Sequence, residues 1–240
     1  MPATVVLLHG FAGTGRAWDA VVERLDPERY TAPAPDLRGH GTARDARPID
    51  FDAVVADILA AAPPRFDLCG YSMGGRVALQ VALAAPDRIE RLILVATTAG
   101  IEDAGERAAR READERLARF TESAIIEAFA DRWMGQPIFA GTPPGAARVW
   151  REDLLRNDPH ALAAALRGLG SGAMAPLWHR LRELAMPATV IAGENDPRYL
   201  AIARDRLVPA LPRAQLAIVP GAGHGLPREA PGAIAAAIAR

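Results

Sequence analysis

The six residues GYSMGG at positions 70–75 decide the fold, because they separate a run typical of a buried strand from a run of helical period. They fit the pattern G-x-S-x-G, the nucleophile elbow, in which a serine on a sharp strand-to-helix turn exposes its hydroxyl at the carboxyl edge of a sheet. The turn needs small neighbours because it is tight and the backbone of Ser72 is strained. The helix that follows directs free N–H groups and its positive dipole end at the same point. The alternative is a chance strand-to-helix turn without function.

Outward from this turn, β-branched and apolar runs alternate with stretches of helical period. Such alternation predicts an α/β fold, with a mostly parallel sheet flanked by helices. The expected strands are residues 4–9, 30–34, 66–70, 91–96, 188–192 and 215–219. The expected helices are residues 16–25, 51–61, 74–84, 198–207 and 228–239.

The alternation breaks once, between the fourth and fifth expected strands. Residues 100–186 contain helical patterns and Gly/Pro turns but no convincing strand. We therefore expect a core formed by residues 1–99 and 187–240, and a helical cap, or lid, formed by residues 100–186. Such an insertion would cover the carboxyl edge of the sheet, where ligands bind in open parallel sheets.

The charge balance excludes several classes of protein. The chain has 240 residues, of which 28 are arginine and 29 are acidic; it has no lysine, and its formal net charge is −1. A protein that binds nucleic acid regardless of sequence needs a basic excess, and a disordered chain has few apolar residues. Because 50% of this chain is hydrophobic, we expect a globular protein without a nucleic-acid partner. A near-neutral surface leaves the oligomeric state open.

Two features bear on where the protein works. No run of about 18 apolar residues predicts a membrane span, and the apolar run 4–8 is too short for the core of a signal peptide. We therefore expect a cytoplasmic protein without a membrane partner. The single Cys69 fits a reducing compartment, and we expect it to be a buried packing residue.

An acid and a histidine follow two later strands in the order that the serine requires. A serine hydroxyl becomes reactive when an imidazole takes its proton and a carboxylate fixes the tautomer of that imidazole. In this architecture the chain order is serine, acid, histidine. Asp196 and His224 each lie just past an expected strand end, so Ser72, Asp196 and His224 form the predicted catalytic triad. Glu194 is the rival acid, and Asp196 alone could be a turn residue before Pro197.

The turn after the first strand supplies a second element of the site. The backbone N–H groups of Phe11 and Met73 are expected to form an oxyanion hole. Two other interpretations exist for this region. Glycines at positions 10, 13 and 15 followed by Asp36 imitate a dinucleotide-binding unit, but their spacing is not G-x-G-x-x-G. Asp36 and His40 alone supply too few ligands for a metal, so we expect that loop to support the pocket.

These motifs resemble the α/β-hydrolase superfamily along essentially the whole chain. The middle of the chain narrows the resemblance to the 2-succinyl-6-hydroxy-2,4-cyclohexadiene-1-carboxylate synthases of menaquinone biosynthesis. The residues that carry this similarity are 70–76, 100–103, 106–107, 110, 129–131, 133, 136–139, 156–157 and 166–168. The resemblance implies a lyase that abstracts a ring proton from a succinyl-enolpyruvyl-hydroxycyclohexene carboxylate and expels pyruvate, with no cofactor and no metal.

Arginines near the triad agree with such a substrate, which carries three carboxylates. Guanidinium groups bind carboxylates in a bidentate manner. Arg76 lies one helical turn after Ser72, and Arg110 belongs to a lid helix. We expect Arg76, Arg110 and Arg156 to bind the small polyanionic substrate.

Other residues of the lid have simpler interpretations. Residues 106–119 alternate in charge like a solvated helix face, and we assign Arg107 and Arg111 to that face. Trp133 is expected to stack on the substrate, with simple packing as the alternative.

Three function classes therefore remain for the structure to weigh. The first is the lyase, in which Ser72 acts as a base. The second is a serine hydrolase of a small ester, lactone or carbon–carbon bond, in which Ser72 is the nucleophile. The third is a ligand-binding receptor with a vestigial triad, which an intact Ser72, Asp196 and His224 disfavour.

Overall fold

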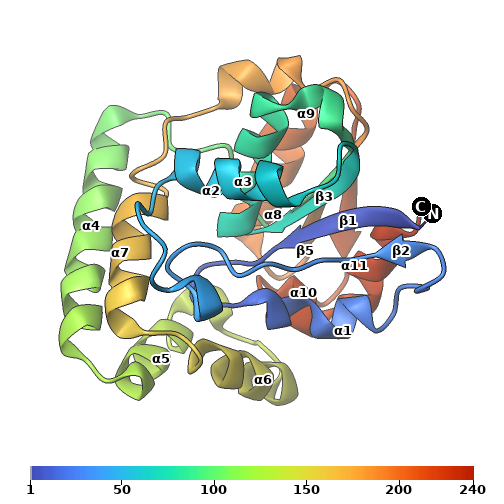
Figure 1. Ribbon diagram of the computed structural model, residues 1–240. Helices are drawn as coiled ribbons and strands as arrows, with labels where there is room; N and C mark the ends of the chain where they lie inside the picture. Colours follow the sequence, from blue (N-terminus) through green and yellow to red (C-terminus); the bar gives the residue numbers. More distant parts are fainter. Residues whose placement is uncertain (1) are drawn as a thin grey trace.

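A computed structural model describes residues 2–240 of the chain as a six-stranded sheet covered by helices (Figure 1). The strands are β1 (Ala3–Leu8), β2 (Tyr30–Thr31), β3 (Phe66–Tyr71), β4 (Ile89–Val95), β5 (Ala188–Gly193) and β6 (Ala214–Val219). The α-helices outside the insertion are α1 (Asp19–Val22), α2 (Phe51–Ala61), α3 (Met73–Ala84), α8 (Pro197–Ile202), α9 (Val208–Ala210), α10 (Leu226–Glu229) and α11 (Pro231–Ile238). Between β4 and β5 lie α4 (Ala104–Ser123), α5 (Ile126–Met134), α6 (Pro144–Leu154) and α7 (Pro159–Leu169).

The strand order is β2-β1-β3-β4-β5-β6, and every neighbouring pair is parallel. The expected α/β fold with a parallel sheet is therefore confirmed. Parallel pairing places all carboxyl ends at one edge of the sheet. The register aligns Leu8 with Gly70 and Gly193 with Val219 at this edge. Loops that follow different strands consequently meet there, which is where a site can assemble.

Two proline positions shorten the second strand relative to the expected range 30–34. Only Tyr30 and Thr31 pair as β2, because Pro33 and Pro35 lack the N–H group that a ladder requires. The carbonyl of Pro33 still accepts a hydrogen bond from the N–H of Leu7 at 2.9 Å. The chain therefore continues alongside β1 without being a strand.

Three expected helices are divided. The range 16–25 becomes a 3₁₀ turn, η1 (Gly15–Trp18), followed by the short α1. The range 198–207 continues from α8 into a π-helical turn at Ala203–Leu207. The range 228–239 separates into α10 and α11 at Ala230, whose φ of −141° is not helical. The residue before a proline is disfavoured in the helical region, and Pro231 follows directly.

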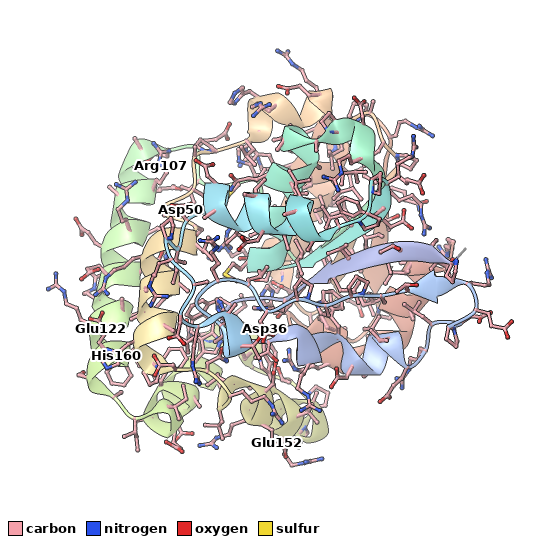
Figure 2. All side chains as sticks on the ribbon, viewed as in Figure 1. Asp36, Asp50, Arg107, Glu122, Glu152 and His160 are labelled. Carbon is pink, nitrogen blue, oxygen red and sulfur yellow. The ribbon has the colours of Figure 1, made fainter. Side chains whose placement is uncertain are left out.

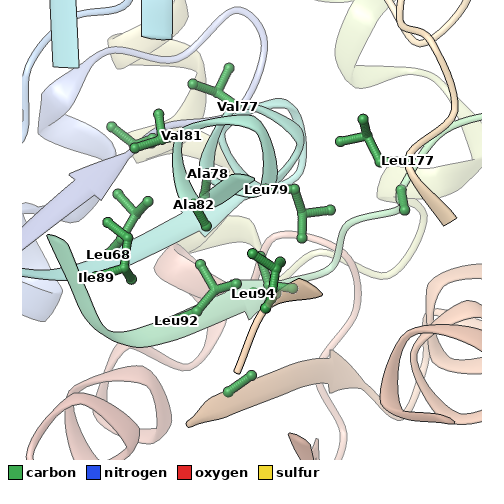
Figure 3. Close-up of a cluster of buried hydrophobic side chains, with 14 of the residues drawn as sticks. Leu68, Val77, Ala78, Leu79, Val81, Ala82, Ile89, Leu92, Leu94 and Leu177 are labelled. Carbon is green, nitrogen blue, oxygen red and sulfur yellow. The ribbon is translucent and has the colours of Figure 1, made fainter. Parts of the chain in front are cut away.

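The sheet is buried on both faces. The helices α2 and α3 pack on one face, and α1 and α11 pack on the other (Figure 1). The close-up in Figure 3 shows how apolar side chains of α3, such as Leu79 and Ala82, face Leu68, Leu92 and Leu94 of the central strands. Burial on both faces explains why these strands are apolar runs rather than alternating patterns. Packing on both faces also fixes the positions of the strand ends that carry the site.

The helices α4 to α7 form a cap at the side and base of the molecule in the view of Figure 1. The long helices α4 and α7 pack against each other. Arg167 of α7 bridges Glu115 and Glu122 of α4, and Figure 2 labels Glu122 on this outer surface. Within residues 2–240, no helix is long and apolar enough to cross a membrane.

Candidate active site

The turn between β3 and α3 presents Ser72 in a strained conformation. The φ and ψ angles of Ser72 are 52° and −108°, in a region that non-glycine residues rarely adopt. A Cβ atom on Gly74 would lie 2.1 Å from the carbonyl oxygen of Leu8, so a larger residue cannot occupy that position. The backbone of Ser72 is held at both ends: its N–H donates to Val95 at 2.9 Å and its carbonyl accepts from the Thr97 hydroxyl at 2.7 Å. The surrounding structure thus fixes the strained serine.

Ser72, His224 and Asp196 meet at the carboxyl edge of the sheet. Nε2 of His224 lies 3.2 Å from Oγ of Ser72, and Nδ1 of His224 lies 2.7 Å from Oδ2 of Asp196. Because a carboxylate only accepts, Nδ1 carries the proton and Nε2 presents its lone pair to the serine. Both His224 and Asp196 are 4% exposed, so water competes little with these hydrogen bonds. The arrangement can remove a proton from Ser72.

The acid of this arrangement is Asp196 rather than its rival. Besides His224, Asp196 accepts from the N–H of Tyr199 at 3.2 Å and so caps α8. This second bond fixes the carboxylate that faces the imidazole. Glu194 is exposed and instead accepts from the N–H of Gly221 at 2.8 Å.

Two residues in the wall of the same cleft carry backbone N–H groups that could stabilise an oxyanion. Both Phe11 and Met73 line the cleft that contains Ser72. Within residues 2–240 neither N–H group donates to a backbone or side-chain acceptor. A Cβ atom on Gly10 would lie 2.8 Å from the ring of Tyr71, so only glycine allows this loop to approach the elbow. The two donors are therefore available for an oxyanion.

The cleft is a small cavity of about 230 Å³ between the sheet edge and the cap. Arg76 and Arg110 both line it, as does Asp114, which forms an ion pair with Arg110. Arg76 is 7% exposed, and its Nη2 donates to the carbonyl of Leu169 at 2.8 Å. Burial lowers the pKa of Arg76 from its ordinary value, and the charge of Asp114 opposes that effect. Within residues 2–240, Nε of Arg76 has no acceptor and Oδ2 of Asp114 has no donor.

Trp133 lies in the wall of the cleft and also packs within the cap. Its ring centroid is 4.9 Å from Phe11 in an edge-on arrangement and 6.0 Å from Phe129 in a stacked one. Its indole N–H has no acceptor among the described residues. The position of Trp133 is therefore compatible both with packing in the cap and with contact to a substrate, because its ring packs against Phe11 and Phe129 while the side chain borders the cleft.

The structure does not bring Arg156 to the cleft, contrary to the expectation from the sequence. Arg156 is exposed and borders two open grooves on the outside of the molecule. The reason is its neighbour Asn157, which is buried and donates to the carbonyl of Ala12 at 3.1 Å while accepting from the N–H of Gly41 at 2.9 Å. Because these hydrogen bonds hold the Asn157 side chain in the interior, the side chain of the adjacent Arg156 faces the solvent.

The remaining lid arginines also lie outside the cleft. Arg107 donates to the carbonyls of Ile101 and Glu102, and Arg111 donates to the carbonyl of Gly172. Neither lines the cavity around Ser72. Figure 2 labels Arg107 near the start of α4.

Several polar residues that line the cleft were not among the site residues expected from the sequence: Tyr71, Asp114, Gln136, Ser171, Arg198 and Tyr199. Burial holds the pKa of Tyr71 well above its ordinary value, so its hydroxyl is a neutral donor beside the serine. Arg198 and Tyr199 follow Asp196 within the first turn of α8. Their position in the sequence could have indicated them, because residues that directly follow an acid at the sheet edge lie beside the same cleft.

The loop containing Asp36 supports the site from outside the cleft. The carboxylate of Asp36 accepts from the N–H of Gly15 at 2.7 Å and from both the N–H and the hydroxyl of Thr42, at 2.8 and 2.7 Å. These bonds leave Asp36 tied to two loops, as expected for a supporting residue and unlike a ribose-binding acid. Among residues 2–240, no group of three or more His, Cys, Asp or Glu side chains could hold a metal ion.

Two buried histidines beneath Phe11 are neutral. Nδ1 of His9 donates to the carbonyl of Gly10 at 2.8 Å, and its Nε2 accepts from the N–H of Leu37 at 2.9 Å. His40 lies 5.0 Å from His9 between ring centroids. Burial, followed by the nearby His9, lowers the pKa of His40 from 6.5 to about 3.

We expect these histidines to make the protein less stable in mild acid. The pKa of His40 is depressed in the folded state, so the unfolded chain binds the proton first and stability falls as the pH drops below 6.5. Between about pH 6.5 and 4.5, His40 alone should cost about 2 kcal/mol of the free energy of unfolding. Urea unfolding at several pH values measures this slope. His40→Gln should flatten it; an unchanged slope in that variant would contradict the assignment.

The fold and the site together define the class of protein. The alpha/beta hydrolase family model matches residues 5–237, and the chain belongs to this family. The chain is 33% identical, over 98% of its length and 90% of the relative, to a 2-succinyl-6-hydroxy-2,4-cyclohexadiene-1-carboxylate synthase of Enterobacter sp. (strain 638). It is also 32% identical to a pimeloyl-[acyl-carrier protein] methyl ester esterase of Nitrosomonas europaea, over 92% of this chain and 88% of that one.

A solved structure agrees with the first of these relatives. The structure of MenH from S. aureus superposes with a TM-score of 0.91 at 30% identity, covering 99% of this chain and 92% of that chain. The similarity extends over the cap as well as the core, since it covers nearly the whole chain. The resemblance to the synthases is thus shown in both sequence and structure.

Proposed function

We propose that the protein is a lyase of menaquinone biosynthesis that eliminates pyruvate from a succinyl-enolpyruvyl-hydroxycyclohexene carboxylate. The observation that carries the proposal is the pair of guanidinium groups, Arg76 and Arg110, in the same cleft as Ser72. A polycarboxylate substrate needs such groups next to the reacting atoms. The synthases among the relatives support the same assignment.

In the proposed reaction Ser72 acts as a base. Its oxygen takes a proton from a ring carbon of the substrate while its own proton passes to Nε2 of His224, 3.2 Å away. The electron pair of the broken C–H bond forms a ring double bond, and the carbon–oxygen bond to the enolpyruvyl group breaks. That group leaves with the electron pair and becomes pyruvate after taking up a proton. The products are pyruvate and the cyclohexadiene carboxylate.

Two groups of residues assist this chemistry. The N–H groups of Phe11 and Met73 stabilise the enolate-like charge that develops during proton removal. Asp196 orients His224 and stabilises the imidazolium that forms.

The direct test is release of pyruvate from the enolpyruvyl substrate by the purified protein. Lactate dehydrogenase and NADH report pyruvate continuously, and the spontaneous elimination rate of the substrate is the reference. We expect release well above that reference. Release at the spontaneous rate would contradict the lyase assignment.

Neutralising Arg76 should weaken substrate binding more than turnover. A buried guanidinium that meets a carboxylate contributes about 1.5–3 kcal/mol, so Arg76→Gln should raise KM about 10- to 100-fold. The matched control is Arg116→Gln, because Arg116 is an exposed arginine of α4 that does not line the cleft. Steady-state pyruvate release measures both. Equal KM values in Arg76→Gln and the wild type would exclude Arg76 from binding.

The second candidate function is hydrolysis of a small ester, with Ser72 as nucleophile. The relative named as a methyl ester esterase favours it, because the same triad geometry suits acyl transfer. Rapid-mixing experiments with a p-nitrophenyl ester distinguish the two functions. A burst of product equal to the enzyme concentration, without pyruvate release, would support the esterase.

A further inference from the structure

The loop that carries His224 is rich in glycine. Residues 220–225 contain three glycines, which have the greatest backbone freedom of all residues, at positions 221, 223 and 225. His224 must nevertheless keep Nε2 within 3.2 Å of Ser72. The bond to Asp196 orients the ring but does not hold the backbone on either side of it.

The backbone on both sides of His224 is bound by one carboxylate. Oε2 of Glu229 accepts from the N–H of Gly223 at 2.5 Å, and Oε1 accepts from the N–H of Gly225 at 3.0 Å. The N–H of Glu229 in turn donates to the carbonyl of Gly225 at 2.9 Å. The two bonds to the carboxylate flank His224, and the third closes the first turn of α10.

We infer that Glu229 is a positioning residue, which holds the His224 imidazole against Ser72 by binding the N–H groups of Gly223 and Gly225. The inference rests on the triad of the proposed function. Glu229 does not line the cleft and touches no reacting atom, so it acts only through His224.

Helix capping alone does not account for these contacts. Gly225 is the N-cap of α10, and capping requires only the bond that the N–H of Gly225 donates to the carboxylate of Glu229. The second bond goes to Gly223, which lies outside the helix on the far side of His224. Because α10 has only four residues, capping by both carboxylate oxygens of Glu229 would add little to its stability as a helix.

The helical insertion that contains α4 to α7 contacts the carboxylate of Glu229 as well. The hydroxyl of Thr142, in the turn before α6, donates to Oε1 of Glu229 at 3.3 Å. A Cβ atom on Gly225 would lie 2.5 Å from the ring of Trp150 in α6, so the histidine loop is enclosed by this helix as well. Figure 1 shows α10 beside α6.

The test separates positioning from stability by measuring reaction at Ser72 without substrate. A fluorophosphonate reacts with the serine at a rate that depends on His224, and the label counts competent sites. In Glu229→Gln the amide keeps one acceptor but turns its NH₂ toward the other N–H group. We expect the second-order rate of labelling and kcat per labelled site to fall about 10- to 100-fold, with KM unchanged.

The matched control removes a carboxylate of similar structural value away from the site. Asp50, which Figure 2 labels, caps α2 by accepting from the N–H of Ala53 at 2.8 Å and does not line the cleft. Asp50→Ala should lower the melting temperature and leave the labelling rate unchanged. If Glu229 had only a structural role, Glu229→Gln would behave like Asp50→Ala. Fewer sites would be labelled, and each labelled site would react at the wild-type rate.

A second variant keeps the inference testable if Glu229→Gln does not fold. Glu229→Asp retains the charge but is one methylene too short to reach both N–H groups, so its labelling rate should also fall. A wild-type labelling rate per site in either folded variant would overturn the inference. Failure of the wild-type protein to react would instead contradict the triad itself.

Discussion

Replacing Ser72 with alanine is expected to reduce pyruvate release by about 10²- to 10⁴-fold, the contribution of a well-placed base. The variant should keep the backbone of the elbow, because the N–H group of residue 72 still donates to the carbonyl of Val95 and its carbonyl still accepts from the hydroxyl of Thr97. The arginines and the oxyanion donors remain, so residual activity above the spontaneous rate should persist. Steady-state release, followed over hours, measures the loss.

A ligand-binding control shows that the loss concerns chemistry. The Ser72→Ala variant should bind the product with the wild-type affinity in isothermal titration, because Arg76 and Arg110 are unaltered. A fall of less than tenfold in kcat would mean that His224 or a water molecule removes the proton directly.

Replacing Asp153 with alanine should have the largest effect on stability. Asp153 of α6 forms an ion pair with Arg228 of α10, and both side chains are 5% exposed. Its carboxylate also accepts from the N–H and the hydroxyl of Thr14, in the loop after β1. Removal leaves a buried guanidinium without a partner, which costs about 3–5 kcal/mol of the free energy of unfolding. Urea denaturation measures this difference.

A double variant distinguishes an unpaired charge from lost packing. Asp153→Asn combined with Arg228→Gln removes both charges and retains polar groups of similar size. Its loss of stability should be smaller than that of Asp153→Ala, because no buried charge is left alone. A double variant that is as unstable as the single one would show that the charge pair itself, rather than the unpaired guanidinium, is what matters.

The sequence determined the features whose signals are local. The turn around Ser72 needs small residues because a Cβ atom at Gly74 would collide with Leu8, and this requirement is written in the motif itself. The order of serine, acid and histidine after three strand ends predicted which residues meet, because parallel strands bring their carboxyl ends to one edge. The helical character of the insertion followed from its patterns.

Other features required the tertiary structure, because they depend on which way a chain faces after it has packed. Both Arg110 and Arg156 were expected from the sequence to bind the substrate, yet Arg110 lines the cleft and Arg156 is exposed beside the buried Asn157. The helix break before Pro231 and the shortening of β2 both follow from the chemistry of proline. The helix and strand ranges expected from the sequence nevertheless extended across these prolines.

The sequence by itself therefore determined the fold class and the identity of Ser72, Asp196 and His224, since both follow from periodicity and from motifs at strand ends. Only the tertiary structure decided which arginines share the cleft with Ser72 and that Glu229 binds the backbone around His224. The physical reason is that burial and hydrogen bonding are properties of packed surfaces. Residues far apart in the chain supply those surfaces, and local patterns do not record their directions.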